Sequence, residues 1–177
     1  MPLVVLLRGL NVGGHRAFRP SRLAADLAHL DMVNIGATGT FVVRRPVSLT
    51  RLRAEIARRL PFEAEIVICQ GREILRLLDL TFFKRQRVPP GAVRFVSVLS
   101  RLPRDAPRLP IVLPPSGAWL VKVLGREGRF VVGLYRRHMK VIGYLGSLDR
   151  LFGTRLTTRS WNTLQQIARA LEPGVNT

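Results

Sequence analysis

The feature that most constrains the fold is an apolar run that leads directly into a glycine-rich turn near the start of the chain. Residues 3–7 are continuously apolar, a pattern typical of a strand that is covered on both faces. The turn that follows contains Gly9, Gly13 and Gly14. Glycine relieves the backbone of side-chain clashes, so several N–H groups can point at one anion. The sequence therefore predicts a central strand followed by a binding loop.

Polar side chains accompany these glycines. Arg8 and Arg16 supply fixed positive charge and Asn11 supplies an amide, which together suit an anion. The alternative is structural: the glycines turn the chain toward a helix, and Asn11 bonds within its own turn. The loop has neither the P-loop ending nor the glycine spacing of dinucleotide-binding folds. His15 has no acid within the loop to orient it, which favours a solvated histidine over a catalytic base.

A second polar stretch, TTRSWNT at residues 157–163, lies near the end of the chain. Hydroxyl groups beside Arg159 and Asn162 at the start of a helix would bind an oxyanion through side chains, free N–H groups and the helix dipole. In the structural alternative Thr158 or Ser160 caps the helix and Trp161 anchors it in the core. Both roles are compatible, because a cap would fix the helix end that presents Arg159.

Hydrophobic periodicity between these stretches predicts alternating strands and helices. In the first half we expect helices capped by Ser21 and Thr50 and a short helix opened by Gly71. In the second half we expect strands near 92–99, 118–124 and 129–135, a helix capped by Ser147, an edge strand at Leu156 and a final helix. Residues 101–116 contain five prolines and should form an extended excursion tethered at 111–113. The predicted class is α+β with largely antiparallel sheets.

The basic Pro/Gly segment at residues 84–91 is the predicted domain boundary. It separates an N-terminal half, residues 1–83, from a C-terminal half, residues 92–177. The order of predicted elements in the first half gives a two-layer α/β unit of about 80 residues. The sequence therefore predicts two small halves joined by a linker.

The chain of 177 residues carries 29 Lys and Arg against 11 Asp and Glu, a formal charge of +18. This excess predicts either a surface that attracts phosphate-bearing partners or a solvated basic surface that aids solubility. A cluster at residues 135–140, which includes Arg136, Arg137 and Lys140, is where nucleic acid would make contact. No paired carboxylates, metal-type cluster or nucleophile motif is present in the sequence, so we predict no metal and no cofactor and assign no catalytic residue.

No apolar run approaches the roughly 20 residues that cross a bilayer, so we expect no membrane span. Cys69 is the only cysteine and lies in an apolar run, which excludes an intrachain disulfide and favours a buried, unreactive thiol. These features fit a reducing compartment, and we expect a cytoplasmic protein.

The segments LLRGLNVGG at 6–14 and LTTRSWNT at 156–163 resemble the two signatures of the bacterial Domain of Unknown Function 1697 family. The resemblance covers nearly the whole chain. It implies a cytoplasmic α+β protein of two ferredoxin-like halves with no established activity, and it implies that the two polar stretches are characteristic positions. The chain departs from the family at residues 38–40, where Thr-Gly-Thr replaces Ser-Gly-Asn, and at Ser160, where the family has Asn.

Three hypotheses of function follow. The first is a binding module in which a phosphate-bearing small molecule or nucleic-acid backbone contacts six ligand-binding residues: Arg8, Asn11, Gly13, Gly14, Arg159 and Asn162. The second is an enzyme acting on a phosphorylated metabolite or nucleotide, in which the same residues stabilise charge and His15 moves a proton. The third is a basic protein that binds nucleic acid or an acidic protein partner. The sequence leaves open whether any reaction is catalysed.

Overall fold

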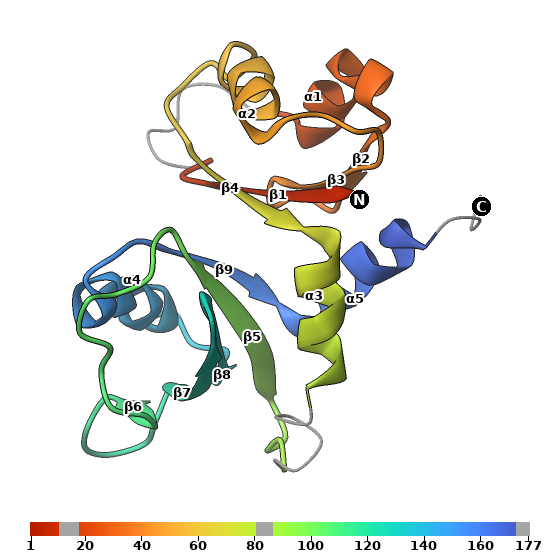
Figure 1. Ribbon diagram of the computed structural model, residues 1–177. Helices are drawn as coiled ribbons and strands as arrows, with labels where there is room; N and C mark the ends of the chain where they lie inside the picture. Colours follow the sequence, from red (N-terminus) through yellow and green to blue (C-terminus); the bar gives the residue numbers. More distant parts are fainter. Residues whose placement is uncertain (11–17, 81–86, 173–177) are drawn as a thin grey trace. The chain divides into compact units, whose positions relative to one another are not determined.

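The structure is a computed structural model that describes residues 1–10, 18–80 and 87–172 (Figure 1). The chain divides into two compact units. Unit 1 comprises Met1–Leu78 and Thr163–Thr177, and unit 2 comprises Asp79–Asn162. Each unit contains one β-sheet, and the two units are described separately below.

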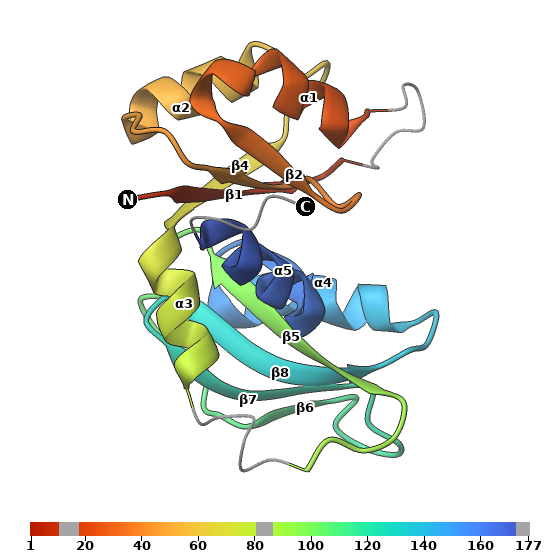
Figure 2. The same cartoon turned by 90° about the vertical axis from the view of Figure 1, so that its right-hand side faces the viewer.

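Unit 1 contains a four-stranded antiparallel sheet with the strand order β2-β3-β1-β4. Helices α1 and α2 cover one face of this sheet (Figures 1 and 2). The described elements are β1 (Leu3–Arg8), α1 (Pro20–Asp26), a 3₁₀ turn (Ala28–Leu30), β2 (Met32–Ile35), β3 (Thr40–Val43), α2 (Leu49–Ala57), β4 (Glu65–Gln70) and α3 (Gly71–Asp79).

The core of unit 1 forms because alternate residues of β1 point toward the two helices. Val5 and Leu7 pack in one cluster with Leu27, which follows α1, and with Leu52 and Ile56 of α2. The residues between them in β1 are buried as well, so the strand is covered on both faces, as the continuous apolar run predicts. β1 is therefore the central strand on which unit 1 is built.

Unit 2 contains a five-stranded antiparallel sheet with the strand order β6-β7-β8-β5-β9. Phe95 and Leu99 of the central strand pack against Leu148 and Phe152 of α4. The described elements are β5 (Ala92–Leu99), β6 (Ile111–Leu113), β7 (Val121–Glu127), β8 (Phe130–Arg136), α4 (Val141–Phe152) and β9 (Leu156–Ser160). The chain then continues into α5 (Trp161–Leu171), most of which belongs to unit 1. The proline-rich excursion is tethered at β6, as predicted.

The two sheets share one connectivity. Unit 1 has the element order β-α-β-β-α-β, which is the order of the ferredoxin-like motif. In unit 2, strands β7-β8-β5-β9 repeat the arrangement β2-β3-β1-β4. The excursion containing β6 takes the place of the first helix, and β6 extends the sheet beyond β7. The predicted α+β class with antiparallel sheets is confirmed.

The last helix groups with the first unit. Arg44 Nε donates a hydrogen bond of 3.0 Å to the carbonyl of Ala170. A Cβ placed on Gly71 would lie 2.7 Å from a methyl carbon of Leu171, so glycine permits this close approach. The two units therefore have other bounds than the predicted halves 1–83 and 92–177, because a helix near the end of the sequence belongs to unit 1. Residues 84–86 of the predicted linker lie outside the described residues.

Three predicted helix starts are wrong, and one strand that begins where predicted is longer than expected. Helix α1 begins at Pro20 with Arg19 at the N-cap position, so Ser21 lies inside the helix. The cap of α2 is Ser48, whose hydroxyl accepts from the Arg51 N–H at 3.2 Å, and not Thr50. Helix α4 begins at Val141 rather than near Ser147, and β9 continues from Leu156 through Ser160.

Candidate functional site

An arginine-lined pocket of about 710 Å³ lies within unit 1, beside the start of α1 and the end of α2. Three arginines face one aspartate in its lining, so the pocket carries an excess of positive charge. We call it the α1–α2 pocket. Its lining residues are Phe18, Arg19, Ser21, Arg22, Leu23, Asp26, Arg59 and Pro61.

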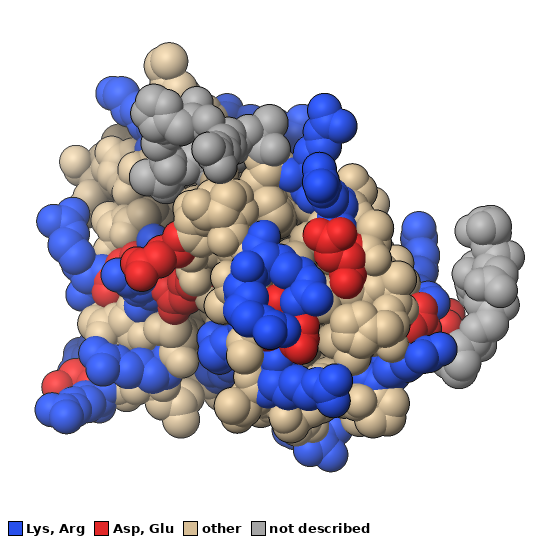
Figure 3. All heavy atoms as spheres, turned by 90° about the horizontal axis from the view of Figure 1, so that it is seen from above, with Lys and Arg blue, Asp and Glu red and all other residues tan. Residues whose placement is uncertain are grey.

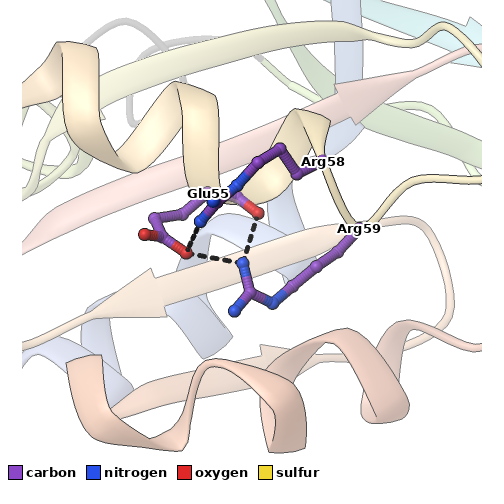
Figure 4. Close-up of polar contacts among 3 residues, drawn as sticks. All are labelled: Glu55, Arg58 and Arg59. Atoms are coloured by element: carbon purple, nitrogen blue, oxygen red, sulfur yellow. Dashed lines mark hydrogen bonds and ion pairs between the residues drawn. The ribbon is translucent and has the colours of Figure 1, made fainter.

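Glu55 holds Arg59 in place (Figure 4). The Arg59 guanidinium bonds to the Glu55 carboxylate and also donates to the Glu55 carbonyl at 2.9 Å. The same carboxylate oxygen lies 2.8 Å from the guanidinium of Arg58. One carboxylate therefore serves two arginines, which neutralises them only in part. Arg58 is the more exposed of the two, with 66% of its side chain accessible against 29% for Arg59, and it does not line the pocket.

The electrostatics of this trio favour the ionised carboxylate. The hydrogen bond from Arg59 lowers the pKa of Glu55 below its ordinary value of 4.5, and the hydrogen bond from Arg58 lowers it further. Glu55 therefore stays charged at neutral pH and holds Arg59 at the pocket wall. Charge-assisted hydrogen bonds of this kind are stronger than neutral ones and fix geometry as well.

An apolar wall complements the arginines. The ring of Phe18 contacts the ring of Phe62 edge-on, with a centroid distance of 5.7 Å and an interplanar angle of 81°. Phe18 also packs against the core of unit 1, and Leu23 is buried. The pocket thus combines a fixed apolar surface with guanidinium groups, which suits a ligand that has both an anionic and an apolar part.

Basic side chains also lie on the surface of the molecule outside this pocket. Figure 3, which shows the molecule from above, displays Lys and Arg over much of the face, with Asp and Glu in a few small groups. A surface of this kind raises the local concentration of anions before they reach a specific site. The field alone does not select a ligand, and selection has to come from the lining residues.

The glycine-rich loop is only partly described. Arg8 ends β1 and is half-buried, and it lies opposite Glu65 in the register of β1 and β4. Gly9 has a positive φ of 90°, which glycine adopts without strain. Asn11, Gly13, Gly14, His15 and Arg16 lie outside the described residues.

The second polar stretch covers the end of strand β9 and the start of helix α5, which follow each other directly. The sequence predicts only the helix start. Arg159 lies in β9 with 9% of its surface exposed, and it donates to the Thr158 carbonyl at 2.8 Å. Burial lowers the pKa of Arg159 to about 10, because the charged form loses solvation. The Thr158 hydroxyl pairs with that of Ser97 at 2.6 Å. Asn162 is exposed in the first turn of α5, three residues beyond Arg159.

The sequence does not predict that Arg19, Arg22 and Arg59 line one pocket. They come from two segments about 40 residues apart, and no local motif connects them. One signal was available: the four-residue spacing between Glu55 and Arg59, which places the two side chains together on a helix surface. The remaining information lies in the packing of α1 beside α2.

The described residues form neither a metal site nor a membrane-spanning helix. Within residues 1–10, 18–80 and 87–172, no three His, Cys, Asp or Glu side chains are grouped so as to hold a metal ion. In the same parts of the chain, no helix has the length and apolar character needed to cross a membrane. Cys69 is buried in β4.

The fold is that of an α+β protein with two antiparallel sheets, and the site is an arginine-lined pocket beside the start of α1 and the end of α2. No family model matches the chain, and no curated protein matches it. A similar solved structure is that of the conserved bacterial protein SP0830 from Streptococcus pneumoniae, with a TM-score of 0.61 and 13% sequence identity. The match covers 96% of this chain and 97% of that chain, and it concerns the fold alone.

Proposed function

We propose that this protein binds a phosphate-bearing small molecule in the α1–α2 pocket. The observation that carries the proposal is the group of three arginines against a single aspartate in one lining, with Arg59 held there by Glu55. Planar guanidinium groups match phosphate oxygens and bind them through paired hydrogen bonds. The apolar wall around Phe18 favours a ligand with an apolar or planar part, such as the base of a nucleotide.

The glycine-rich loop supports the same function. Phe18 and Arg19 are the first described residues after that loop, and they also line the pocket. A loop with glycine N–H groups would add backbone donors to the arginine side chains. Arg8, Asn11, Gly13 and Gly14 therefore stay predicted ligand-binding residues. Arg159 and Asn162 also stay predictions, but they belong to unit 2 and do not line the α1–α2 pocket. A binding role is favoured over catalysis because Asp26 is the one carboxylate in the described lining and no histidine accompanies it.

The test compares two neighbouring arginines that share one carboxylate. We expect Arg59→Gln to weaken binding of inorganic pyrophosphate and of nucleotides at least tenfold, because a guanidinium that contacts phosphate is worth about 1.5 to 3 kcal/mol. Arg58→Gln also removes one positive charge that pairs with Glu55, but Arg58 does not line the pocket. This variant should therefore leave the affinity nearly unchanged. Isothermal titration calorimetry measures both. Equal losses in the two variants would show that only the overall charge matters and would overturn the proposal.

A second candidate function is nucleic-acid binding, and a group of residues in unit 2 favours it. The Trp119 ring has the Arg136 guanidinium carbon 4.2 Å and the Lys122 ammonium 4.5 Å from its centroid. We call these three residues the Trp119 cluster. Cations and aromatic rings placed together bind the phosphates and stack with the bases of single-stranded nucleic acids. Quenching of Trp119 fluorescence by a single-stranded polynucleotide would test this function.

We also propose a family and a cellular compartment for this protein. The two signatures at residues 6–14 and 156–163 support membership of the Domain of Unknown Function 1697 family. A structure of a family member with the strand orders of units 1 and 2 would test that membership. The single cysteine, buried in β4, supports a reducing compartment such as the cytoplasm, which fractionation of expressing cells would test.

A further inference from the structure

The shared connectivity of the two units identifies one corner of unit 2 as the equivalent of the α1–α2 pocket. In unit 1, the last residue of the central strand, Arg8, lies opposite the first residue of the edge strand, Glu65. In unit 2, Leu99 and Leu156 lie opposite each other in the same way. In both units the helix that precedes the edge strand leads into this corner, and the edge strand runs directly into a further helix.

This corner of unit 2 is hollow and lined by arginines. Two adjoining pockets, of about 520 and 650 Å³, share Arg101, Arg150 and Gly153 in their linings. As in unit 1, the lining comes from the segment after the central strand and from the end of the preceding helix. Together the two linings contain four arginines and two aspartates: Arg101, Arg104, Arg150, Arg155, Asp105 and Asp149.

Hydrogen bonds fix the backbone of this corner, and Asp149 accepts two of them. The Asp149 carboxylate accepts the Leu156 N–H at 3.0 Å, and the Asp149 carbonyl accepts the Thr154 N–H at 3.1 Å. The hydroxyls of Ser100 and Thr154 pair at 2.9 Å. Gly153 closes α4 with a positive φ of 64°, a conformation that glycine adopts readily. With four arginines against two aspartates in the linings, the corner carries an excess of positive charge.

We infer that residues 100–105 and 149–155 form a second binding site for a phosphate group, equivalent by internal repetition to the α1–α2 pocket. The inference rests on the proposed function for its ligand class, and it adds a site on a different unit. Arg104 and Arg150 are exposed and supply the guanidinium groups, while Asp149, Ser100 and Thr154 shape the backbone. Arginines at a helix C-terminus also complement the helix dipole, so a purely structural role is the alternative that the test has to separate.

The experiment follows individual amide resonances of the full-length protein during titration with inorganic pyrophosphate. The amides of Gly153 and Thr154 report on the corner of unit 2, and those of Ser21 and Leu23 report on the α1–α2 pocket. We expect saturable shifts at Gly153 and Thr154 that Arg104→Gln combined with Arg150→Gln weakens at least tenfold. Arg126→Gln combined with Arg137→Gln removes the same two charges from exposed positions outside both linings, so this charge-matched control should leave the shifts unchanged.

Two further arms separate the outcomes. Replacing Arg104 and Arg150 by Lys keeps the charge but removes the planar fork, so binding should be weaker than in the wild type and stronger than in the Gln variant. Sodium chloride at matched ionic strength should not reproduce the shifts. Shifts at Gly153 that persist in the Gln variant, or that chloride reproduces, would overturn the inference. Saturable shifts at Gly153 without shifts at Ser21 and Leu23 would support it while contradicting the proposed function of unit 1.

Discussion

Glu55 is the residue through which pH acts on the α1–α2 pocket. Its carboxylate binds Arg59 and Arg58, and these bonds lower its pKa. A carboxyl group with a lowered pKa in the folded state stabilises the protein above its ordinary pKa. That stabilisation is lost as the pH falls through the lowered value. Acid should therefore release Arg59 from the pocket wall at the same time as it reduces stability.

The corresponding variant is Glu55→Gln. Between about pH 5 and pH 3, where ordinary carboxyl groups titrate, we expect the urea midpoint of the wild type to fall by more than that of the variant. At neutral pH the variant should be less stable, because the amide cannot bond two guanidinium groups as ions. Urea denaturation followed by circular dichroism measures both effects. Parallel pH profiles for the two proteins would show that the trio does not contribute to stability.

At the scale of the element, glycines in two neighbouring elements have opposite roles. Gly133 lies within β8, and a Cβ there would be 2.2 Å from the Lys122 carbonyl oxygen and 2.6 Å from the Phe95 ring. Gly143 and Gly146 lie in α4, where a Cβ would meet nothing within 4 Å. Neither helical glycine has a positive φ. The strand position therefore requires glycine, and the helix positions do not require it for packing or for conformation.

These differences give opposite signs for the same substitution. Gly133→Ala should destabilise unit 2 by about 3 kcal/mol or more, because the added methyl group meets a backbone atom and a buried ring. Gly143→Ala and Gly146→Ala should each stabilise the protein by about 0.5 to 1 kcal/mol, because alanine restricts the unfolded chain more than glycine does. Thermal and urea unfolding measure the three variants. A stable Gly133→Ala protein would contradict the packing described around Phe95.

The elements also show what the sequence could and could not predict. The apolar run in β1 and the strand patterns near 118–124 and 129–135 are sufficient to predict a central strand and the strands β7 and β8. The sequence does not predict the start of α4, because Ile142 is exposed and two glycines interrupt the apolar pattern of the helix. The sequence does not predict the full length of β9, because Thr158 and Ser160 in this strand are also residues that commonly cap a helix. The α1–α2 pocket depends on contacts between distant segments, and local patterns do not encode these.

On the scale of the whole molecule, the excess of Lys and Arg makes any nucleic-acid binding sensitive to salt. We expect the logarithm of the affinity for a single-stranded polynucleotide to fall linearly with the logarithm of the salt concentration, by about 0.7 for each phosphate contacted. Arg136→Gln should reduce this slope by about one contact and weaken quenching of Trp119. The Trp161→Phe background isolates the signal, since the chain has two tryptophans. A slope near zero would contradict nucleic-acid binding.

The membership of α5 in unit 1 has a consequence for how the protein is made. Ribosomes deliver the chain from its N-terminus, so β1 to β4 emerge long before Ala170 and Leu171, the residues that bond to Arg44 and pack on Gly71. All of unit 2 is synthesised in between. The unit that appears first is thus completed last, and it gains its full set of contacts only after Leu171 has been synthesised.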